Sequence, residues 1–141
     1  MDAKRLVSLY DERYAATYNS RFLTSELAQS DAEHEVRLLA KLLQPGGRWL
    51  DVACGTGFFL SRFPECEREG LDLSPAMLAL ARQANPGVTF HLGNFLDERP
   101  EWRNRWDLVS CMWYAYGLVD SMEQIEKIVE NLASWTSPGG H

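Results

Sequence analysis

Residues 50–57 read Leu50-Asp51-Val52-Ala53-Cys54-Gly55-Thr56-Gly57. The first half continues a strand pattern that begins at Arg48, and the second half is a glycine turn from which a helix over 56–62 is expected to open. Glycine lets a ligand approach the backbone closely, and the unpaired N–H groups of such a helix would face that ligand. The stretch predicts a β-turn-α unit, with either a ligand at its turn or a turn that merely connects the two elements. It is not a P-loop, because no Gly-Lys-Ser/Thr follows, and it lacks the full G-x-G-x-x-G spacing of a dinucleotide site.

Strand and helix patterns alternate on both sides of this unit. Ser74 is a good N-cap with Pro75 in the first helical turn, and Ser121 with Gln124 has the spacing of a capping box. A helix over 32–43 follows the cap candidate Ser30-Asp31. The expected strands are 48–53, 68–73, 88–92 and 106–112, and the other expected helices are 75–84 and one from about 121 that buries Ile125, Ile128, Val129, Leu132 and Trp135.

This alternation predicts an α/β fold, a Rossmann-like doubly wound parallel sheet with helices on both faces. We expect a single domain, with an N-terminal helical lid or cap region over 1–45 and the ligand-binding core over 46–141. The turn Pro138-Gly139-Gly140 repeats Pro45-Gly46-Gly47, which precedes the first strand, so the chain is expected to stop before a fifth strand with its C-terminal strands missing. The bare edge of strand 106–112 is then expected to pair with further chain or with a second copy in a homodimer.

The composition favours a packed core and a small-molecule partner. Hydrophobic residues make up 45% of the chain, and the formal net charge of −6 gives no electrostatic footprint for nucleic acid or an anionic membrane. The longest weakly polar run, 108–119, is too short to cross a bilayer, and the N-terminus has no signal-peptide pattern. Three cysteines without paired spacing are expected to be reduced thiols of a cytoplasmic protein, and no metal site is expected.

Asp72 adds a second ligand signal. It lies 21 residues after Asp51, at the end of the second expected strand, where a carboxylate can accept both hydroxyls of a ribose. An isolated Asp before Ser-Pro is also a common neighbour of a helix cap. Together, however, the glycine turn and Asp72 predict a site that binds a nucleoside from two sides.

The chain resembles the class I S-adenosylmethionine-dependent methyltransferases of the small-molecule type. The resemblance rests on five spaced segments that cover nearly the whole chain, together with a Tyr-Asp-x-x-Ala-x-x-Tyr pattern like the lid of such enzymes. That pattern lies within Tyr10-Asp11-Glu12-Arg13-Tyr14-Ala15-Ala16-Thr17-Tyr18-Asn19, and the five segments are 50–57, 70–78, 93–95, 106–112 and 137–140. Ala53 stands where the first segment commonly has glycine.

The resemblance implies S-adenosyl-L-methionine as the cofactor and S-adenosyl-L-homocysteine as the product. Asp72 would bind the ribose hydroxyls, and Asp51 would help to hold the amino group. Tyr10, Tyr14 and Tyr18 recur at i, i+4 and i+8, the spacing of a stripe along one N-terminal helix, and this stripe would belong either to a lid or to the core. The implied cofactor-binding residues are Tyr14, Tyr18, Asp51, Ala53, Gly55, Gly57, Asp72, Leu73, Met77, Asn94, Phe95 and Met112.

The function implied is methyl transfer to a small molecule. Tyr116 stands where some members of the family place a polar catalytic side chain, but with Trp113 and Tyr114 it equally fits an aromatic wall. These aromatics suggest an apolar or ring-bearing acceptor. The alternative function is a non-catalytic S-adenosylmethionine-binding module, a truncated paralogue without the acceptor half. The incomplete glycine pattern argues against a third interpretation, a nicotinamide-dependent oxidoreductase.

Overall fold

The computed structural model describes residues 2–141; Met1, the first residue of the expected cap region, lies outside them. Four parallel strands form one sheet in the order β3-β2-β1-β4. The strands are β1 (Arg48–Val52), β2 (Glu67–Asp72), β3 (Thr89–Leu92) and β4 (Leu108–Cys111). The predicted α/β class is confirmed, and β1 and β2 are the inner strands, each with a neighbour on both sides.

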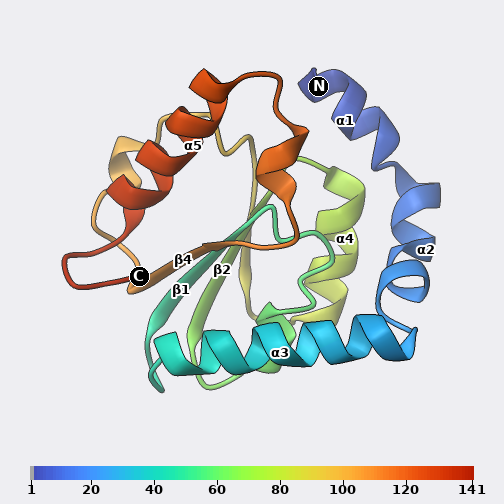
Figure 1. The fold of residues 1–141 in the computed structure, drawn as a ribbon, viewed down its shortest axis with the longest axis horizontal. Coiled ribbons are helices and arrows are strands. Elements are labelled where there is room, and N and C mark those ends of the chain that lie inside the picture. Colours follow the sequence, from blue (N-terminus) through green and yellow to red (C-terminus); the bar gives the residue numbers. More distant parts are fainter. Residues whose placement is uncertain (1) are drawn as a thin grey trace.

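Helices pack on both faces of this sheet because β1 buries side chains on both of its faces. Trp49 belongs to a core cluster with Leu39 and Leu78, whereas Leu50 and Val52 pack in a second cluster with three buried tryptophans. Figure 1 shows α3 and α5 on opposite sides of the sheet. The helices are α1 (Ala3–Leu9), α2 (Glu12–Phe22), α3 (Glu26–Leu42), α4 (Pro75–Ala84) and α5 (Met122–Trp135).

The caps predicted for α4 and α5 are confirmed. The Ser74 hydroxyl accepts from the Met77 N–H, and the Ser121 hydroxyl accepts from the Gln124 N–H. The predicted buried face of α5 is wrong at Val129, which is 61% exposed. Asn131 is buried instead, because its amide donates to the main-chain oxygen of Phe95.

The helix predicted over 56–62 is wrong: only a 3-10 helix over Leu60–Arg62 forms there. Gly57 has φ +71°, outside the helical region, and Pro64 follows too closely for an α-helix to develop. Phe59, Leu60 and Phe63 of this short segment are buried in the core. The glycine turn is therefore followed by packed apolar side chains, and no α-helix opens from it.

Two N-terminal boundaries also differ from the prediction. The helix expected over 32–43 begins earlier, because the Ser25 side chain accepts from the Ala28 N–H and caps α3 there. The stripe of tyrosines does not lie on one helix. Tyr10 ends α1, and the Asp11 side chain accepts from the Tyr14 N–H to start α2.

The outer edge of β4 is partly paired, contrary to the expectation of a bare edge. The Ser137 N–H donates to the Trp106 oxygen at 2.7 Å, and the Val109 N–H donates to the His141 oxygen at 2.9 Å. The turn after α5 brings the last residues back along the start of the strand, with Trp106 and Thr136 in a parallel bridge. Residues 106–109 thus have a neighbour from the same chain.

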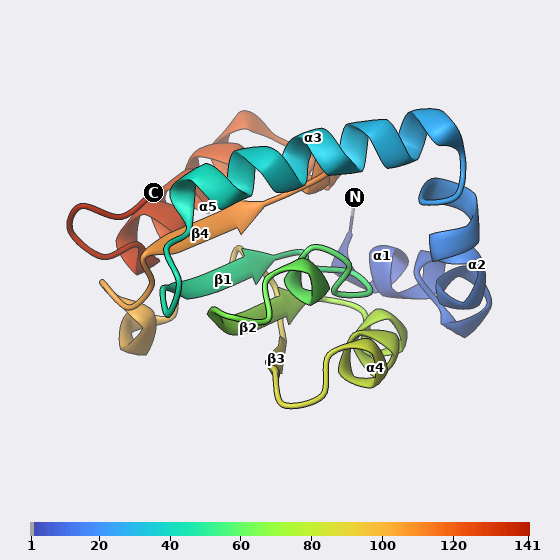
Figure 2. The same ribbon diagram turned by 90° about the horizontal axis from the view of Figure 1, so that it is seen from below.

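In Figure 2 the arrowheads of β1 and β2 point toward α1 and α2, whereas the C-terminus lies at the opposite end. Within residues 2–141, no helix combines the length and apolar character that a membrane span requires.

Candidate functional site

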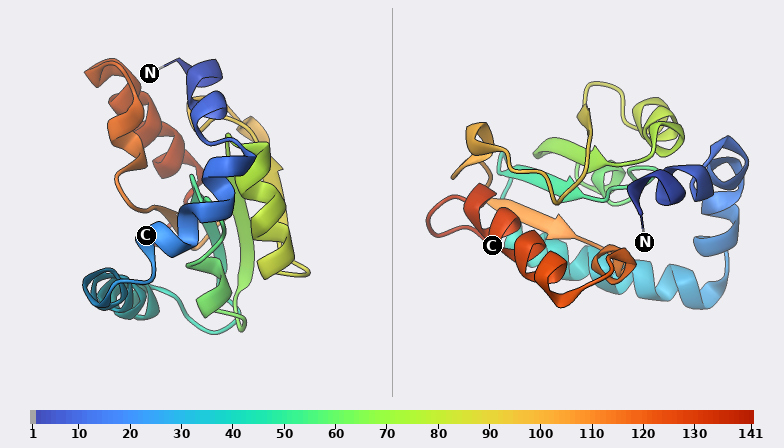
Figure 3. Two further views of the ribbon diagram at one scale, coloured as in Figure 1. Left: turned by 90° about the vertical axis from the view of Figure 1, so that its right-hand side faces the viewer. Right: turned by 90° about the horizontal axis from the view of Figure 1, so that it is seen from above.

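A cavity of about 320 Å³ lies at the carboxyl ends of the strands. The left view of Figure 3, taken from that side, shows α1 and α2 crossing in front of the sheet. The cavity is also lined by the turn after β1, the start of α4 and the loops after β3 and β4. Ten of the residues predicted to bind a ligand line it: Tyr18, Asp51, Ala53, Gly55, Asp72, Leu73, Met77, Asn94, Phe95 and Met112.

Three predicted site residues lie elsewhere. The Tyr14 ring packs edge-on against Tyr10, with ring centroids 4.9 Å apart, behind the cavity wall. A Cβ at Gly57 would lie 2.7 Å from the amide nitrogen of Asn85, so this glycine serves close packing and does not border the cavity. Tyr116 is 40% exposed and stacks at 4.8 Å on Tyr114, outside the lining.

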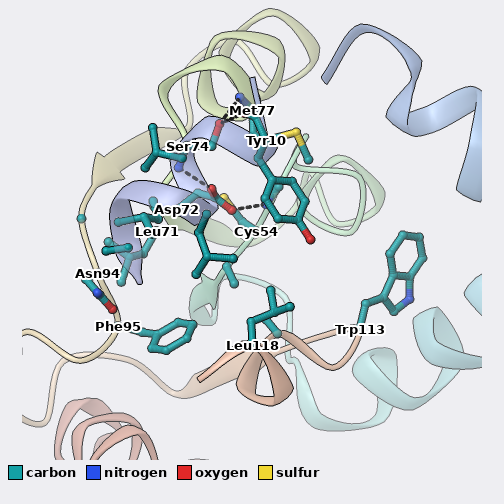
Figure 4. A pocket seen from close by; sticks show the side chains of 18 of the residues that line it. Tyr10, Cys54, Leu71, Asp72, Ser74, Met77, Asn94, Phe95, Trp113 and Leu118 are labelled. Carbon is teal, nitrogen blue, oxygen red and sulfur yellow. Dashed lines mark hydrogen bonds between the residues drawn. The ribbon is translucent and has the colours of Figure 1, made fainter. Parts of the chain in front are cut away.

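Asp72 organises the loops around the cavity. One carboxylate oxygen accepts from the Gly55 N–H and the other from the Ser74 N–H, each at 2.8 Å. Burial raises the pKa of Asp72, and these N–H bonds oppose that shift. A carboxylate oxygen has two lone pairs, so each oxygen retains acceptor capacity for a ligand hydroxyl. Figure 4 shows Asp72 beside the Tyr10 ring, with Phe95, Leu118 and Trp113 across the cavity.

Asp51 is the second carboxylate at the floor of the cavity and is only 1% exposed. The Ser110 hydroxyl donates to its Oδ1 at 2.6 Å. Burial raises the pKa of Asp51 to about 7; the charge of Asp72 adds to the shift and the Ser110 bond opposes it. Near neutral pH both the protonated and the ionised form of this carboxyl group are therefore populated.

The free energy of unfolding is expected to respond to this pKa. The folded-state pKa of Asp51 lies above the ordinary aspartate value of 3.8, so the folded protein binds more protons than the unfolded chain between about pH 4 and pH 7. The contribution of Asp51 is full below that range and is lost as the pH rises through 7. Urea unfolding of the ligand-free protein at pH 5, 6 and 7 measures how the free energy of unfolding falls with pH, and Asp51→Asn should make this fall smaller. An equal fall in the variant would contradict the raised pKa of Asp51.

The cover over the cavity consists of α1 and α2, and among the described residues two side-chain hydrogen bonds join it to the core. The Ser74 hydroxyl donates to the main-chain oxygen of Tyr10 at 2.6 Å, and the Thr56 hydroxyl donates to the amide oxygen of Asn19 at 2.8 Å. Among the described residues of α1 and α2, only Ala15 is buried. Burial, followed by the neighbouring tyrosines, raises the pKa of Tyr18 to about 12, so its hydroxyl stays neutral at pH 7. The described part of the cover is thus lightly packed against the core.

An aromatic wall closes the end of the cavity beside the cover. Trp113 packs at 5.3 Å on Phe59 and lies 6.4 Å from Tyr18 between ring centroids. Its indole N–H donates to the Glu35 carboxylate on α3 at 2.5 Å, and its backbone φ of 53° is unusual for a tryptophan. The wall residues Phe58 and Phe59, and the lining residues Leu6, Val7, Leu118 and Val119, are absent from the set predicted to bind a ligand.

The charges around the cavity have one sign. Among the described lining residues none is Lys, Arg or His, and the carboxylates are Asp2, Asp51, Asp72 and Asp120. Such a lining attracts cationic groups and repels anions. Within residues 2–141, no group of three or more metal-ligating side chains is placed to hold a metal ion.

Comparison with known proteins points to one family. A family model described as a methyltransferase domain matches residues 50–140. A dTDP-4-amino-2,3,4,6-tetradeoxy-D-glucose N,N-dimethyltransferase of Saccharopolyspora spinosa is 30% identical over 113 residues, which are 79% of this chain and 45% of that protein. A trans-aconitate 2-methyltransferase of Acidovorax sp. (strain JS42) is 41% identical over 78 residues, 50% of this chain and 30% of that protein.

Solved structures agree. The S-adenosylmethionine-bound CalS10, an amino pentose methyltransferase from Micromonospora echinaspora, superposes with a TM-score of 0.67 at 32% identity, covering 90% of this chain and 52% of that one. The chain thus spans about half the length of the relatives that it matches.

Proposed function

This chain belongs to the methyltransferase domain family of class I S-adenosylmethionine-dependent enzymes, and from that premise we propose that its cavity binds S-adenosylmethionine for methyl transfer to a small-molecule acceptor. The predicted family and cofactor are confirmed by the family match and by relatives solved with that cofactor. The observation that carries the proposal for this chain is the pair of carboxylates, Asp51 and Asp72, at the floor of a cavity with no basic lining residue among those described.

The lining residues suit each part of the cofactor. Asp72 would accept from the ribose hydroxyls, and Asp51 would accept from the α-ammonium group. Gly55 has φ +55° and no side chain, which leaves room for the ligand beside the turn. Leu73 and Met77 would pack against adenine, while Asn94 and the Phe95 N–H would bind its edge. Ala53 and Met112 would line the methionine portion.

The protein's contribution to methyl transfer is alignment and exclusion of water. When bound, S-adenosylmethionine supplies a methyl group already activated by its sulfonium sulfur. Trp113 and Phe59 would shield that end of the cavity from water, and Tyr18 on the cover would close it from above. A lone pair of the acceptor then forms the new bond to the methyl carbon as the carbon–sulfur bond breaks, leaving S-adenosylhomocysteine.

The acceptor that fits this lining carries an amine. The negative lining favours an acceptor that carries a cationic amino group, whereas an acceptor carboxylate would meet like charge. The Saccharopolyspora and Micromonospora relatives are named for amino-sugar substrates. Only the atoms of the acceptor that enter the cavity must suit its charge, because an anionic group elsewhere on the acceptor would lie outside it. Trp113 supplies the apolar surface expected from the sequence; a role of Tyr116 as base stays a prediction.

Calorimetry and an acceptor panel test the function. We expect S-adenosylmethionine to bind at one site per chain, and methyl transfer to amino sugars but not to tricarboxylates such as trans-aconitate. Transfer to the tricarboxylate alone would overturn the amine assignment. Absence of cofactor binding would overturn the function itself, and binding without any transfer would favour the non-catalytic alternative.

Removal of the cover is expected to speed ligand release. Deleting residues 1–20 removes α1 and the pocket-lining Tyr10 and Tyr18, while the sheet keeps its own core clusters. Stopped-flow dissociation of S-adenosylhomocysteine should be faster in the deletion variant, with an unchanged sheet signal in circular dichroism. Unfolding of the variant would show that the tyrosines belong to the core and that the lid interpretation is wrong.

Two further expectations complete the proposal. All three cysteines are free, which supports a reducing, cytoplasmic location. Pairing of β4 with a second copy in a homodimer stays a prediction, and light scattering on the purified protein tests it.

A further inference from the structure

A row of three hydrogen-bonded side chains runs from the core to the cavity. Trp49 and Asp51 point to the same face of β1, and Ser110 pairs with Asp51 in the register of β1 and β4. The Trp49 indole nitrogen donates to the Ser110 hydroxyl at 2.9 Å, and that hydroxyl donates to Asp51 Oδ1 at 2.6 Å. Trp49 is fully buried, so the row has a fixed end in the core.

The chemistry of the three groups fixes the direction of every proton in the row. An indole N–H only donates, so the Ser110 oxygen must accept from Trp49. The single hydroxyl proton of Ser110 is then directed to Asp51 Oδ1. The hydrogen bond from Trp49 therefore helps to keep the Ser110 proton directed at the carboxylate. The buried indole N–H and the buried hydroxyl group both have hydrogen-bond partners within the row.

We propose that Ser110, oriented by Trp49, is a positioning residue that presents the Asp51 carboxylate to the α-ammonium group of S-adenosylmethionine. The inference rests on the proposed function and deepens it. With Oδ1 held by Ser110, Oδ2 is the oxygen available to the ammonium group. Neither Trp49 nor Ser110 borders the cavity, so both act through Asp51.

The groups that face Asp51 make its ionisation depend on the ligand. Asp72 lies at the end of β2, Cys54 in the turn after β1 and Cys111 on β4. Burial, chiefly, raises the pKa of both thiols, so they stay neutral and Asp72 supplies the nearby negative charge. An ammonium group placed at Asp51 would therefore favour loss of the Asp51 proton, and binding would release protons to the buffer at pH 6.

Adenosine provides the test on the unmodified protein, because it has the ribose and adenine of the cofactor but no ammonium group. Calorimetry at pH 6 in two buffers of different ionisation enthalpy counts the protons released on binding. We expect S-adenosylmethionine and S-adenosylhomocysteine to release more protons than adenosine. Equal release by all three ligands would overturn the inference while leaving cofactor binding, and hence the proposed function, intact.

Substitution of Ser110 separates positioning from a merely structural role. Ser110→Ala should weaken both ammonium-bearing ligands about tenfold at pH 7, move the pH midpoint of their binding upward, and leave adenosine affinity unchanged. Ser110→Thr keeps the hydroxyl and should restore affinity and midpoint. Ser134→Ala, which removes a hydroxyl bonded within α5, is the matched control.

Three outcomes decide between the possibilities. An equal loss of adenosine affinity in Ser110→Ala would show that Ser110 only supports the fold, which overturns the proposal. Failure of unmodified protein to bind S-adenosylmethionine would overturn the proposed function instead. If Ser110→Ala does not fold, Trp49→Phe removes the orienting N–H and retains Ser110. This variant should weaken the dependence of cofactor affinity on pH. An unchanged plot of affinity against pH would contradict the proposal.

Discussion

Replacing Asp72 with alanine is expected to weaken S-adenosylmethionine and S-adenosylhomocysteine alike, by roughly 1.5–3 kcal/mol or about 10- to 150-fold. The substitution removes the acceptor for the ribose hydroxyls. It also removes the acceptors of the Gly55 and Ser74 N–H groups, which shape the turn and the start of α4. Isothermal titration measures the affinity, and thermal unfolding reports the added loss of stability.

Two variants make the Asp72 result interpretable. Asp72→Asn keeps the shape and one acceptor oxygen, so it should lose less stability than Asp72→Ala while still binding the ribose weakly. Asp31→Ala removes an exposed carboxylate of α3 and should change neither quantity. Unchanged cofactor affinity in a folded Asp72→Ala protein would refute the ribose assignment.

Replacing Gly55 with valine is expected to reduce cofactor affinity at least as strongly. Its Cβ would meet only the Met77 Cε, at 3.5 Å, so the protein itself tolerates the first atom. The two methyl groups would then take space in the cavity that Gly55 lines. In addition, φ +55° strains a β-branched residue by roughly 1–2 kcal/mol.

Gly46→Val separates strain from blocked binding. Gly46 has φ +77°, nothing lies within 4 Å of a Cβ there, and it does not border the cavity. Both variants should unfold at lower urea concentration, but only Gly55→Val should lose cofactor affinity. Similar affinity in the two variants would show that the space beside Gly55 is not used by the ligand.

Local signals predicted the elements that depend on neighbours in the sequence. Ser74 and Ser121 each cap a helix through a residue three positions later, and the strands were found within two residues of their bounds. The break after Tyr10 had a signal as well, since Asp11 precedes Tyr14 by the spacing of an N-cap. The i, i+4, i+8 spacing of the tyrosines favoured one continuous helix, and that expectation was wrong.

Other features depend on contacts that no local pattern contains. Gly57 has the spacing of a ligand-binding glycine, yet the position of Asn85 decides its role. Leu6 and Leu118 line the cavity because α1 and the loop after β4 meet across the strand ends. The edge of β4 is paired because of how the turn after Ser137 directs the chain, which the proline and glycines alone did not specify.

The place of β1 in the sheet has a consequence for the order in which the chain can acquire structure during synthesis. Its partner β4 is made only after residues 67–92 have emerged, although Trp49, Leu50 and Val52 are already present and fully buried in the final fold. The Arg48–Asp107 ion pair spans 59 residues and cannot form earlier either. During synthesis, one edge of β1 therefore has no partner strand until the segment Leu108–Cys111 leaves the ribosomal exit tunnel. Until then, this edge can pair with a strand of another chain or with the wrong segment of its own chain.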